Sequence, residues 1–163
     1  LKVIPASDWN RSSSRPSKRG ESWTRDGLSL NELTFYAGIK PGETIFRQGY
    51  EQDKKLPRFK AEMLPTDLVE LFEASNRMLL QSSVFKVEVT EPAKLGGHGA
   101  VRFRYTYAAQ NEDLPRKGEA VAAIINGELH IVNFIAPALF FFDRDIGEVR
   151  KMIETSEVVK AAE

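Results

Sequence analysis

Few side chains in this sequence have the type and spacing needed for chemistry, and the two histidines are the first of them. His98 stands in the glycine-rich segment Gly96–Gly99, and His130 stands in a separate apolar segment. One histidine supplies one metal ligand and nothing in the sequence brings the two together, so loop and core roles are expected for both. The glycines are not expected to bind phosphate, because a phosphate loop leads into a helix and here a strand should follow.

The sequence contains no pattern typical of a catalytic centre. It has no cysteine, no Gly-x-Ser-x-Gly elbow and no His-x-x-Glu pattern. Hydrolysis through a nucleophile needs a base held beside that nucleophile. We therefore expect a protein without enzymatic activity, with no catalytic residues, no metal and no cofactor.

Two arginines are candidates for binding an anion. Arg102 and Arg104 alternate with apolar residues and share a polar strand face with Thr106. The expected role is cross-strand ion pairing, with Lys86 and Glu88 on the facing strand. The alternative is a small anion-binding surface.

Residues 10–20 form the one strongly asymmetric charge segment, with four basic residues, four serines and no acid. Its cations are Arg11, Arg15, Lys18 and Arg19. A solvated flexible loop is expected, and weak attraction to anionic lipid or nucleic acid is the alternative. Over the whole chain 23 basic residues balance 23 acidic ones, so a nucleic-acid partner is not expected.

An apolar run, Leu139–Phe142, is a candidate binding patch. Consecutive aromatic side chains point in different directions, so some of them would face solvent. The expected role is nevertheless to pack the final helix against the sheet, with an exposed interface as the alternative.

The length and composition set the scale of the fold. The chain has 163 residues, of which 42% are apolar. This fits a polar N-terminal segment, residues 1–20, followed by a single domain, residues 21–163. The longest apolar stretch, Ile131–Phe142, is far shorter than the roughly 20 residues that span a bilayer, so no transmembrane segment is expected.

The start of the chain has no charged region and no apolar core typical of a signal peptide. It also lacks an initiator methionine. A trimmed or processed form is expected, and a membrane tether upstream of residue 1 is consistent with it.

Two helices are expected to lie against a sheet. The first spans 67–81 with Thr66 as its cap, because apolar residues recur there at spacings of three and four. The second starts near Asp145, which stands at capping-box spacing from Glu148.

Alternating residues predict the strands. Period two indicates a strand over 28–37 with a break at Asn31-Glu32, a short strand over 44–48, and strands over 85–89 and 101–107. A glycine-rich turn over 92–99 and a polar loop over 110–118 separate these strands from the next elements.

The strongest local signal is a hairpin over 119–135 around Asn126-Gly127, a pair preferred in type I′ turns. Both faces of this hairpin are apolar, so it must be central and covered on both sides. The sequence therefore predicts an α+β fold, a mainly antiparallel sheet with helices on both faces in an α/β/α sandwich.

Several segments together match a known pattern. They are Trp23–Asn31, Leu56–Met63, the helix start at Asp67–Phe72, Gly96-Gly97, Leu129–Pro137 and Ser156. Over residues 21–157 the chain resembles the PsbP/Mog-like domain family, and within it an uncharacterised bacterial secreted or lipoprotein branch.

The resemblance implies a non-enzymatic accessory or interaction domain. It implies a periplasmic or cell-envelope-attached protein with an unknown protein partner, while a cytoplasmic location stays open. The expected contact residues are Trp23, Arg25 and Tyr36, near a sheet edge. The alternative is a small-ligand carrier with a pocket between sheet and helix, lined by Phe and Tyr.

Overall fold

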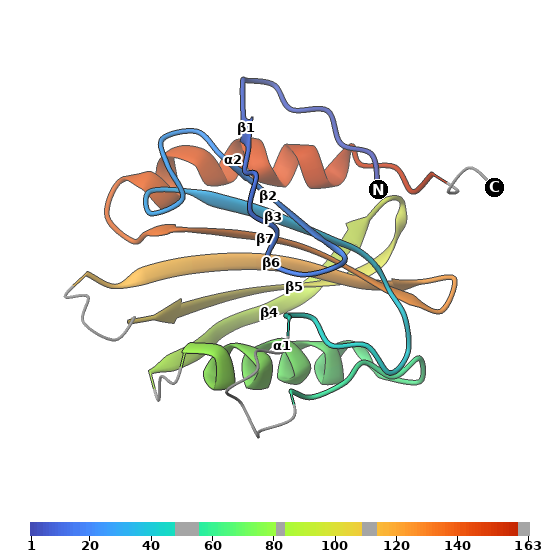
Figure 1. Ribbon diagram of the computed structural model, residues 1–163. Coiled ribbons are helices and arrows are strands. Elements are labelled where there is room, and N and C mark those ends of the chain that lie inside the picture. Colours follow the sequence, from blue (N-terminus) through green and yellow to red (C-terminus); the bar gives the residue numbers. More distant parts are fainter. Residues whose placement is uncertain (48–55, 81–83, 109–113, 160–163) are drawn as a thin grey trace.

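A computed structural model describes residues 1–47, 56–80, 84–108 and 114–159. Within these ranges the chain forms β1 (Asn10–Arg11), β2 (Gly20–Thr24), β3 (Glu32–Ile39), α1 (Pro65–Leu80), β4 (Phe85–Leu95), β5 (His98–Tyr107), β6 (Arg116–Ile125), β7 (Glu128–Pro137) and α2 (Phe141–Glu154). The seven strands of the described residues form one sheet in the order β1-β2-β3-β7-β6-β5-β4, and all neighbours are antiparallel (Figure 1). The predicted α+β class with a mainly antiparallel sheet is confirmed.

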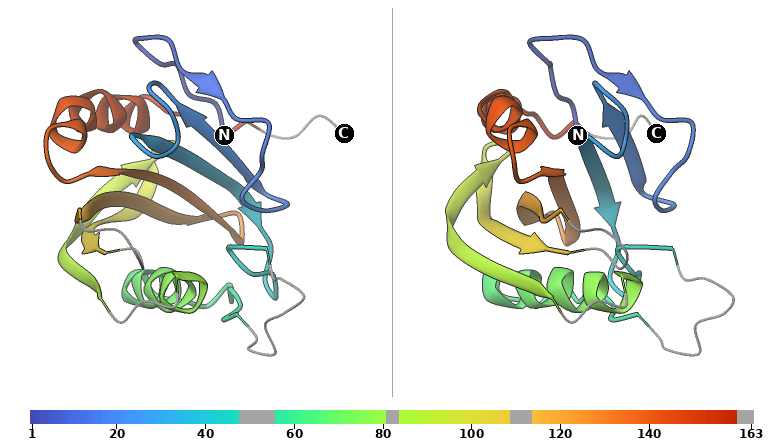
Figure 2. Two further views of the ribbon diagram at one scale, coloured as in Figure 1. Left: turned by 60° about the vertical axis from the view of Figure 1, so that its left-hand side comes forward. Right: turned by 90° about the vertical axis from the view of Figure 1, so that its left-hand side faces the viewer.

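Each helix packs on its own apolar cluster of the sheet. Phe72 of α1 lies in one cluster with Phe103 and Tyr105 of β5. Ile153 and its neighbours on α2 lie in a second cluster with Val121 of β6. Figure 2 shows the two helices apart, with the sheet between them.

The hairpin β6–β7 is central, as predicted. Its turn residues Asn126 and Gly127 have φ of 53° and 77°, the positive values that a type I′ turn requires. Neighbouring residues alternate between the clusters, because Ala122 belongs to the α1 side and Val121 to the α2 side. Both faces of the hairpin are therefore covered.

Helix α1 begins at Pro65, so the predicted cap at Thr66 is wrong. Proline suits the first helical position, because its fixed φ is helical and its missing N–H would have no partner there. The carboxylate of Asp67, in the first turn, accepts a hydrogen bond from the Leu64 amide just before the helix, at 2.8 Å. The predicted end at Gln81 lies outside the described residues.

Strand β3 starts later than predicted. The amides of Leu30 and Asn31 donate to the Gly27 carbonyl at 2.9 and 3.0 Å, so residues 28–30 form a turn. Asn31 is completely buried, and its Oδ1 accepts hydrogen bonds from the amides of Arg25 and Asp26 at 2.7 and 3.1 Å. This side chain holds the turn, and alternation alone did not reveal it.

The short strand predicted over 44–48 is wrong for residues 44–47, and Gln48 lies outside the described residues. The Thr44 hydroxyl donates to the Phe46 carbonyl at 2.7 Å instead of leaving the backbone free for a ladder. Ile45 and Phe46 are nevertheless buried in the cluster under α1. Apolar residues therefore mark core positions here without forming a strand.

Strands β4 and β5 are longer than predicted. They extend to Leu95 and from His98, the residues on either side of the Gly96-Gly97 turn. Strand β6 likewise starts at Arg116, so residues 116–118 are strand where a polar loop was expected. Residues 110–113 of that loop lie outside the described part of the chain.

Helix α2 starts at Phe141, four residues before the predicted start, and Asp145 is no cap. Asp145 is 1% exposed and faces inward, where it pairs with arginines. No side chain caps the helix at Phe140, whose φ is 70°. Among the described residues, neither helix is long and apolar enough to cross a membrane.

The N-terminal segment packs on the domain. Arg11 of β1 pairs with Trp23 of β2, Lys2 forms a bridge with Glu157, and the Ser7 hydroxyl donates to Glu148 at 2.7 Å. Part of the expected loop over 10–20 is thus a strand. The division of the chain at residue 20 stays a prediction.

Gly118 of β6 gives a test of this packing. A Cβ there would lie 2.2 Å from Cζ of Tyr105, a fully buried ring whose hydroxyl donates to Asn133 Oδ1 at 2.6 Å. Because the hydrogen bond holds the ring in place, Gly118→Ala should lower the free energy of unfolding by about 1–3 kcal/mol. Gly99→Ala is the control, since no atom lies within 4 Å of its Cβ. Equal stability of the two variants in urea unfolding would contradict the packing.

Candidate functional site

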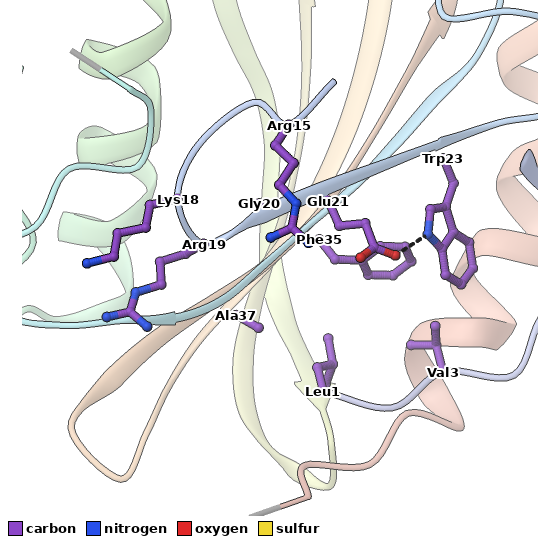
Figure 3. A pocket seen from close by; sticks show the side chains of 10 residues that line it. All are labelled: Leu1, Val3, Arg15, Lys18, Arg19, Gly20, Glu21, Trp23, Phe35 and Ala37. Atoms are coloured by element: carbon purple, nitrogen blue, oxygen red, sulfur yellow. Dashed lines mark hydrogen bonds between the residues drawn. The ribbon is translucent and has the colours of Figure 1, made fainter. Parts of the chain in front are cut away.

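Trp23 forms the aromatic wall of a surface cavity on β2 and β3. Its ring packs edge-on against Phe35, with 4.7 Å between centroids, and its Nε1 donates to Glu21 Oε1 at 2.8 Å. Glu21 pairs with Phe35 across the two strands, so the three side chains share one sheet face (Figure 3). The ring is half-buried and keeps an exposed side.

The cavity, called here the Trp23 pocket, has a volume of about 320 Å³. It is lined by Leu1, Val3, Arg15, Lys18, Arg19, Gly20, Glu21, Trp23, Phe35 and Ala37. The segment that carries its cations was expected to be a solvated loop. Figure 3 shows Lys18 and Arg19 together at one end of this cavity, Arg15 near Glu21, and Trp23 at the other end.

The cations of the Trp23 pocket differ in their pairing. Arg19 donates to both carboxylate oxygens of Glu43 at 3.1 and 3.2 Å, and this guanidinium lowers the pKa of Glu43. Arg15 and Lys18 are exposed and make no ion pair or side-chain hydrogen bond within the described residues. Glu21, the acidic group of the pocket, accepts from Trp23 and pairs with Arg11 at 3.8 Å. The pocket therefore presents two exposed cations outside any ion pair of the described residues, together with an aromatic wall, and this combination suits an anionic group.

Arg25 lies outside this pocket and holds α2 against β2. Its Nη1 donates to Asp145 Oδ1 at 3.2 Å and to Glu148 Oε2 at 3.0 Å, and its guanidinium stacks 5.5 Å from the Trp9 ring centroid. Arg144 pairs with the other oxygen of Asp145 at 2.8 Å. The contacts of Arg25 are thus internal, and its predicted role in binding a partner stays a prediction.

Tyr36 lies on the other face of the sheet, in the cluster under α1, and is 3% exposed. Burial raises its pKa, so the hydroxyl stays protonated at physiological pH. The structure therefore does not bring Trp23, Arg25 and Tyr36 into one site. Tyr36 has little exposed surface for a protein partner, and its role in binding a partner stays a prediction.

Tyr36 lines a second cavity, called here the Tyr36 pocket, of about 260 Å³ between the sheet and α1. Its lining is Pro16, Glu32, Thr34, Tyr36, Phe46, Arg47, Asn76, Leu79, Leu80, Tyr107, Asn133 and Ile135. Glu32 Oε1 accepts from the hydroxyls of Ser22 and Thr34 at 3.2 Å each, and no cation of the described residues pairs with it. Sequence reasoning missed Glu32 and Asn133. The sequence signal that could have identified them is a polar residue at an inward-facing position of a buried strand.

The arginines of β5 hold a buried carboxylate. Glu119 is 3% exposed and accepts from Arg104 at 3.0 Å and from Arg150 of α2 at 2.7 Å. Arg102 pairs with Glu91 at 3.4 Å. The arginines thus form cross-strand ion pairs as expected, but with Glu91 and Glu119. The expected partner Glu88 instead accepts from the Thr106 hydroxyl at 3.2 Å.

The two histidines lie in different surroundings. His98 is exposed at the start of β5, while His130 is 6% exposed on β7 and its Nδ1 has no hydrogen-bond partner in the described part of the chain. Burial lowers the pKa of His130. No group of three potential metal ligands occurs among the residues that the structure describes.

Comparison with known proteins identifies the fold and no family. No family model matches the chain, and no curated protein matches its sequence. A solved structure of a protein of unknown function from Pseudomonas aeruginosa, described as a candidate regulator, has a TM-score of 0.50 at 13% identity over 97% of this chain and 90% of its own. LpqN, which is involved in cell envelope biogenesis of Mycobacterium tuberculosis, has a TM-score of 0.50 at 15% identity over 98% and 83%. Such identities establish a shared fold alone.

Glu119 gives a test of the electrostatics. Burial would raise its pKa, but the hydrogen bonds from Arg150 and Arg104 outweigh burial and hold the pKa below 4.5. The resulting stability is present above pH 4.5 and is lost as the pH falls through the lowered pKa of the folded state.

Glu119→Gln should therefore lower the free energy of unfolding at pH 7 by about 2–3 kcal/mol and flatten its decline below pH 4.5. Asp26, Glu43 and Glu148 also have lowered pKa values, so part of the decline remains. Glu91→Gln, at an exposed partner of Arg102, should change stability by less than about 0.5 kcal/mol. Unfolding titrations from pH 3 to 8 that leave the two variants alike would contradict this assignment.

Proposed function

We propose that this protein is a non-enzymatic interaction domain of a bacterial cell envelope, which binds an acidic segment of a partner protein in the Trp23 pocket. The fold shared with LpqN and the resemblance to the PsbP/Mog-like family support an envelope role and the α/β/α sandwich. The observation that carries the binding site is that two exposed cations outside any ion pair of the described residues, Arg15 and Lys18, line the same cavity as Trp23.

The physical basis of this binding is electrostatic steering followed by aromatic contact. Two cations in a shallow cavity raise the local concentration of an anionic partner, an effect that salt weakens. Tryptophan and arginine are the residues most often responsible for binding energy at interfaces, because they contribute large contact areas and hydrogen bonds together. The short β1 covers the end of β2, and the Ser12 amide donates to the Ser22 carbonyl at 2.8 Å, so this pairing reaches β2 only as far as Ser22.

A fluorescence titration with a hexaglutamate peptide tests the proposed site. The chain has two tryptophans, so a Trp9→Phe background leaves Trp23 as the reporter. Binding should change the Trp23 emission, and Arg15→Glu with Lys18→Glu should weaken it by about tenfold or more, which corresponds to about 1.4 kcal/mol.

The control for this titration is Lys86→Glu with Lys94→Glu, two exposed lysines of β4 with the same total change in charge. Equal weakening by both double variants would mean that only net charge matters. No emission change in the Trp9→Phe protein would contradict the Trp23 pocket as the site.

A small-ligand carrier is the second candidate, and the Tyr36 pocket favours it. The cavity lies between sheet and helix and is lined by Tyr36, Phe46 and Tyr107. The Tyr36 hydroxyl makes no hydrogen bond among the described residues, and its oxygen keeps some accessible surface although the residue as a whole is 3% exposed. A polar ligand that donates to Glu32 and contacts this hydroxyl would satisfy both groups.

A thermal-shift screen of sugars, amines and amino acids tests the carrier. A ligand at one hundred times its Kd should raise the melting temperature by about 5–10 °C. Tyr36→Phe should keep the fold and lose most of that shift, whereas Tyr107→Phe at the rim should retain more of it. If no compound raises the melting temperature, the Tyr36 pocket is not a carrier site for these classes.

A further inference from the structure

An exposed apolar tip lies where β7 leads into α2. Leu139 is 72% exposed, Phe140 is 66% exposed and Leu114 is 60% exposed. The Ala138 amide donates to the Pro115 carbonyl at 3.0 Å, so the segment with Leu114 is tied to the segment with Leu139. These three side chains are called here the Phe140 tip.

The backbone at Phe140 is held in an unfavourable conformation that keeps the tip exposed. Its φ and ψ are 70° and −61°, and the Phe141 amide donates to the Leu139 carbonyl at 2.9 Å. These are the marks of the γ-turn with positive φ, which is rare and strained for a side chain with a Cβ. Strain of this kind is concentrated at functional sites. Phe142, two residues on, is 1% exposed, so the same run supplies both core and surface.

Cations accompany the aromatic rings of this run. The Arg144 guanidinium lies 5.6 Å from the Phe140 ring centroid and 5.1 Å from that of Phe141. Lys117 Nζ lies 5.0 Å from the ring centroid of Phe142. Arg144 also pairs with Asp26 and Asp145, and Asp143 is the exposed acid beside the tip. Lys117 makes no ion pair within the described residues.

The size of the tip decides between a protein and a membrane as its partner. A stable protein interface covers about 800 Å² on each side and some 20–30 residues, far more than three apolar side chains provide. Insertion into a bilayer interface needs few apolar side chains, provided that cations beside them can reach lipid phosphates. Aromatic side chains are also favoured at that depth.

We propose that the Phe140 tip inserts into the headgroup region of an anionic lipid bilayer, with Lys117 beside the lipid phosphates while Arg144 stays paired with Asp26 and Asp145. This attachment goes beyond the proposed partner site and does not depend on it. It would hold the domain on a membrane surface by its own residues.

Co-sedimentation with vesicles tests the tip. The wild-type protein should sediment with phosphatidylglycerol-containing vesicles and about tenfold less with pure phosphatidylcholine. Leu139→Ser with Phe140→Ser should reduce the bound fraction on anionic vesicles by about tenfold. Ile4→Ser with Leu64→Ser is the matched control, since these residues are 68% and 63% exposed elsewhere. It should bind as the wild type does.

A second variant reports the depth of insertion. Phe140→Trp should show a blue-shifted emission on anionic vesicles and quenching by brominated acyl chains, relative to the parent protein. The proposal is overturned if wild-type protein does not bind these vesicles, or if the tip variant and the control bind alike. It is also overturned if sedimentation velocity shows that the tip joins two copies of the chain and that the tip variant is monomeric.

Discussion

The burial of both faces of the hairpin β6–β7 is the constraint on which the rest of the structure depends. A strand pair with apolar side chains on both sides is unstable until each side is covered. Small residues such as Ala120 and Ala122 leave room on one side for Phe103, Tyr105 and the helix α1. Helix α2 covers the other side. Strands β3, β2 and β1 then extend the sheet on one side of the hairpin, and β5 and β4 extend it on the other. Both candidate pockets are lined in part by residues of β3.

Buried polar groups then fix how the parts are placed on this core. Glu119 joins β6 to α2 through Arg150, and Asp145 joins α2 to the chain after β2 through Arg25. A buried carboxylate is costly to desolvate, and here hydrogen bonds from arginines offset that cost. Such pairs favour one placement of the helix over others.

The sequence predicted the helices and strands that are determined by residues close to one another in the chain. The β6–β7 hairpin follows from Asn126-Gly127 and alternation, and the stripe of α1 follows from its spacing of apolar residues. Element ends were missed where a distant contact decides them, as with buried Asn31 before β3 and inward-facing Asp145 in α2. Trp23 was selected from the sequence, but its basic neighbours come from a segment whose position depends on tertiary contacts. Glu32 and Tyr36 share one face of β3, but residues of α1, β5 and β7 complete the Tyr36 pocket, so it had no local signature.

The most direct test of the interaction site is an NMR titration of the ¹⁵N-labelled protein with an acidic peptide, followed through side-chain signals. The Trp23 indole and the Arg15 guanidinium report on the Trp23 pocket, and the side-chain amides of Asn76 and Asn133 report on the Tyr36 pocket. The account predicts that the first pair shifts in a saturable, salt-sensitive way while the second pair stays still. Shifts confined to Asn76 and Asn133, or no saturable shift of the Trp23 indole, would contradict it.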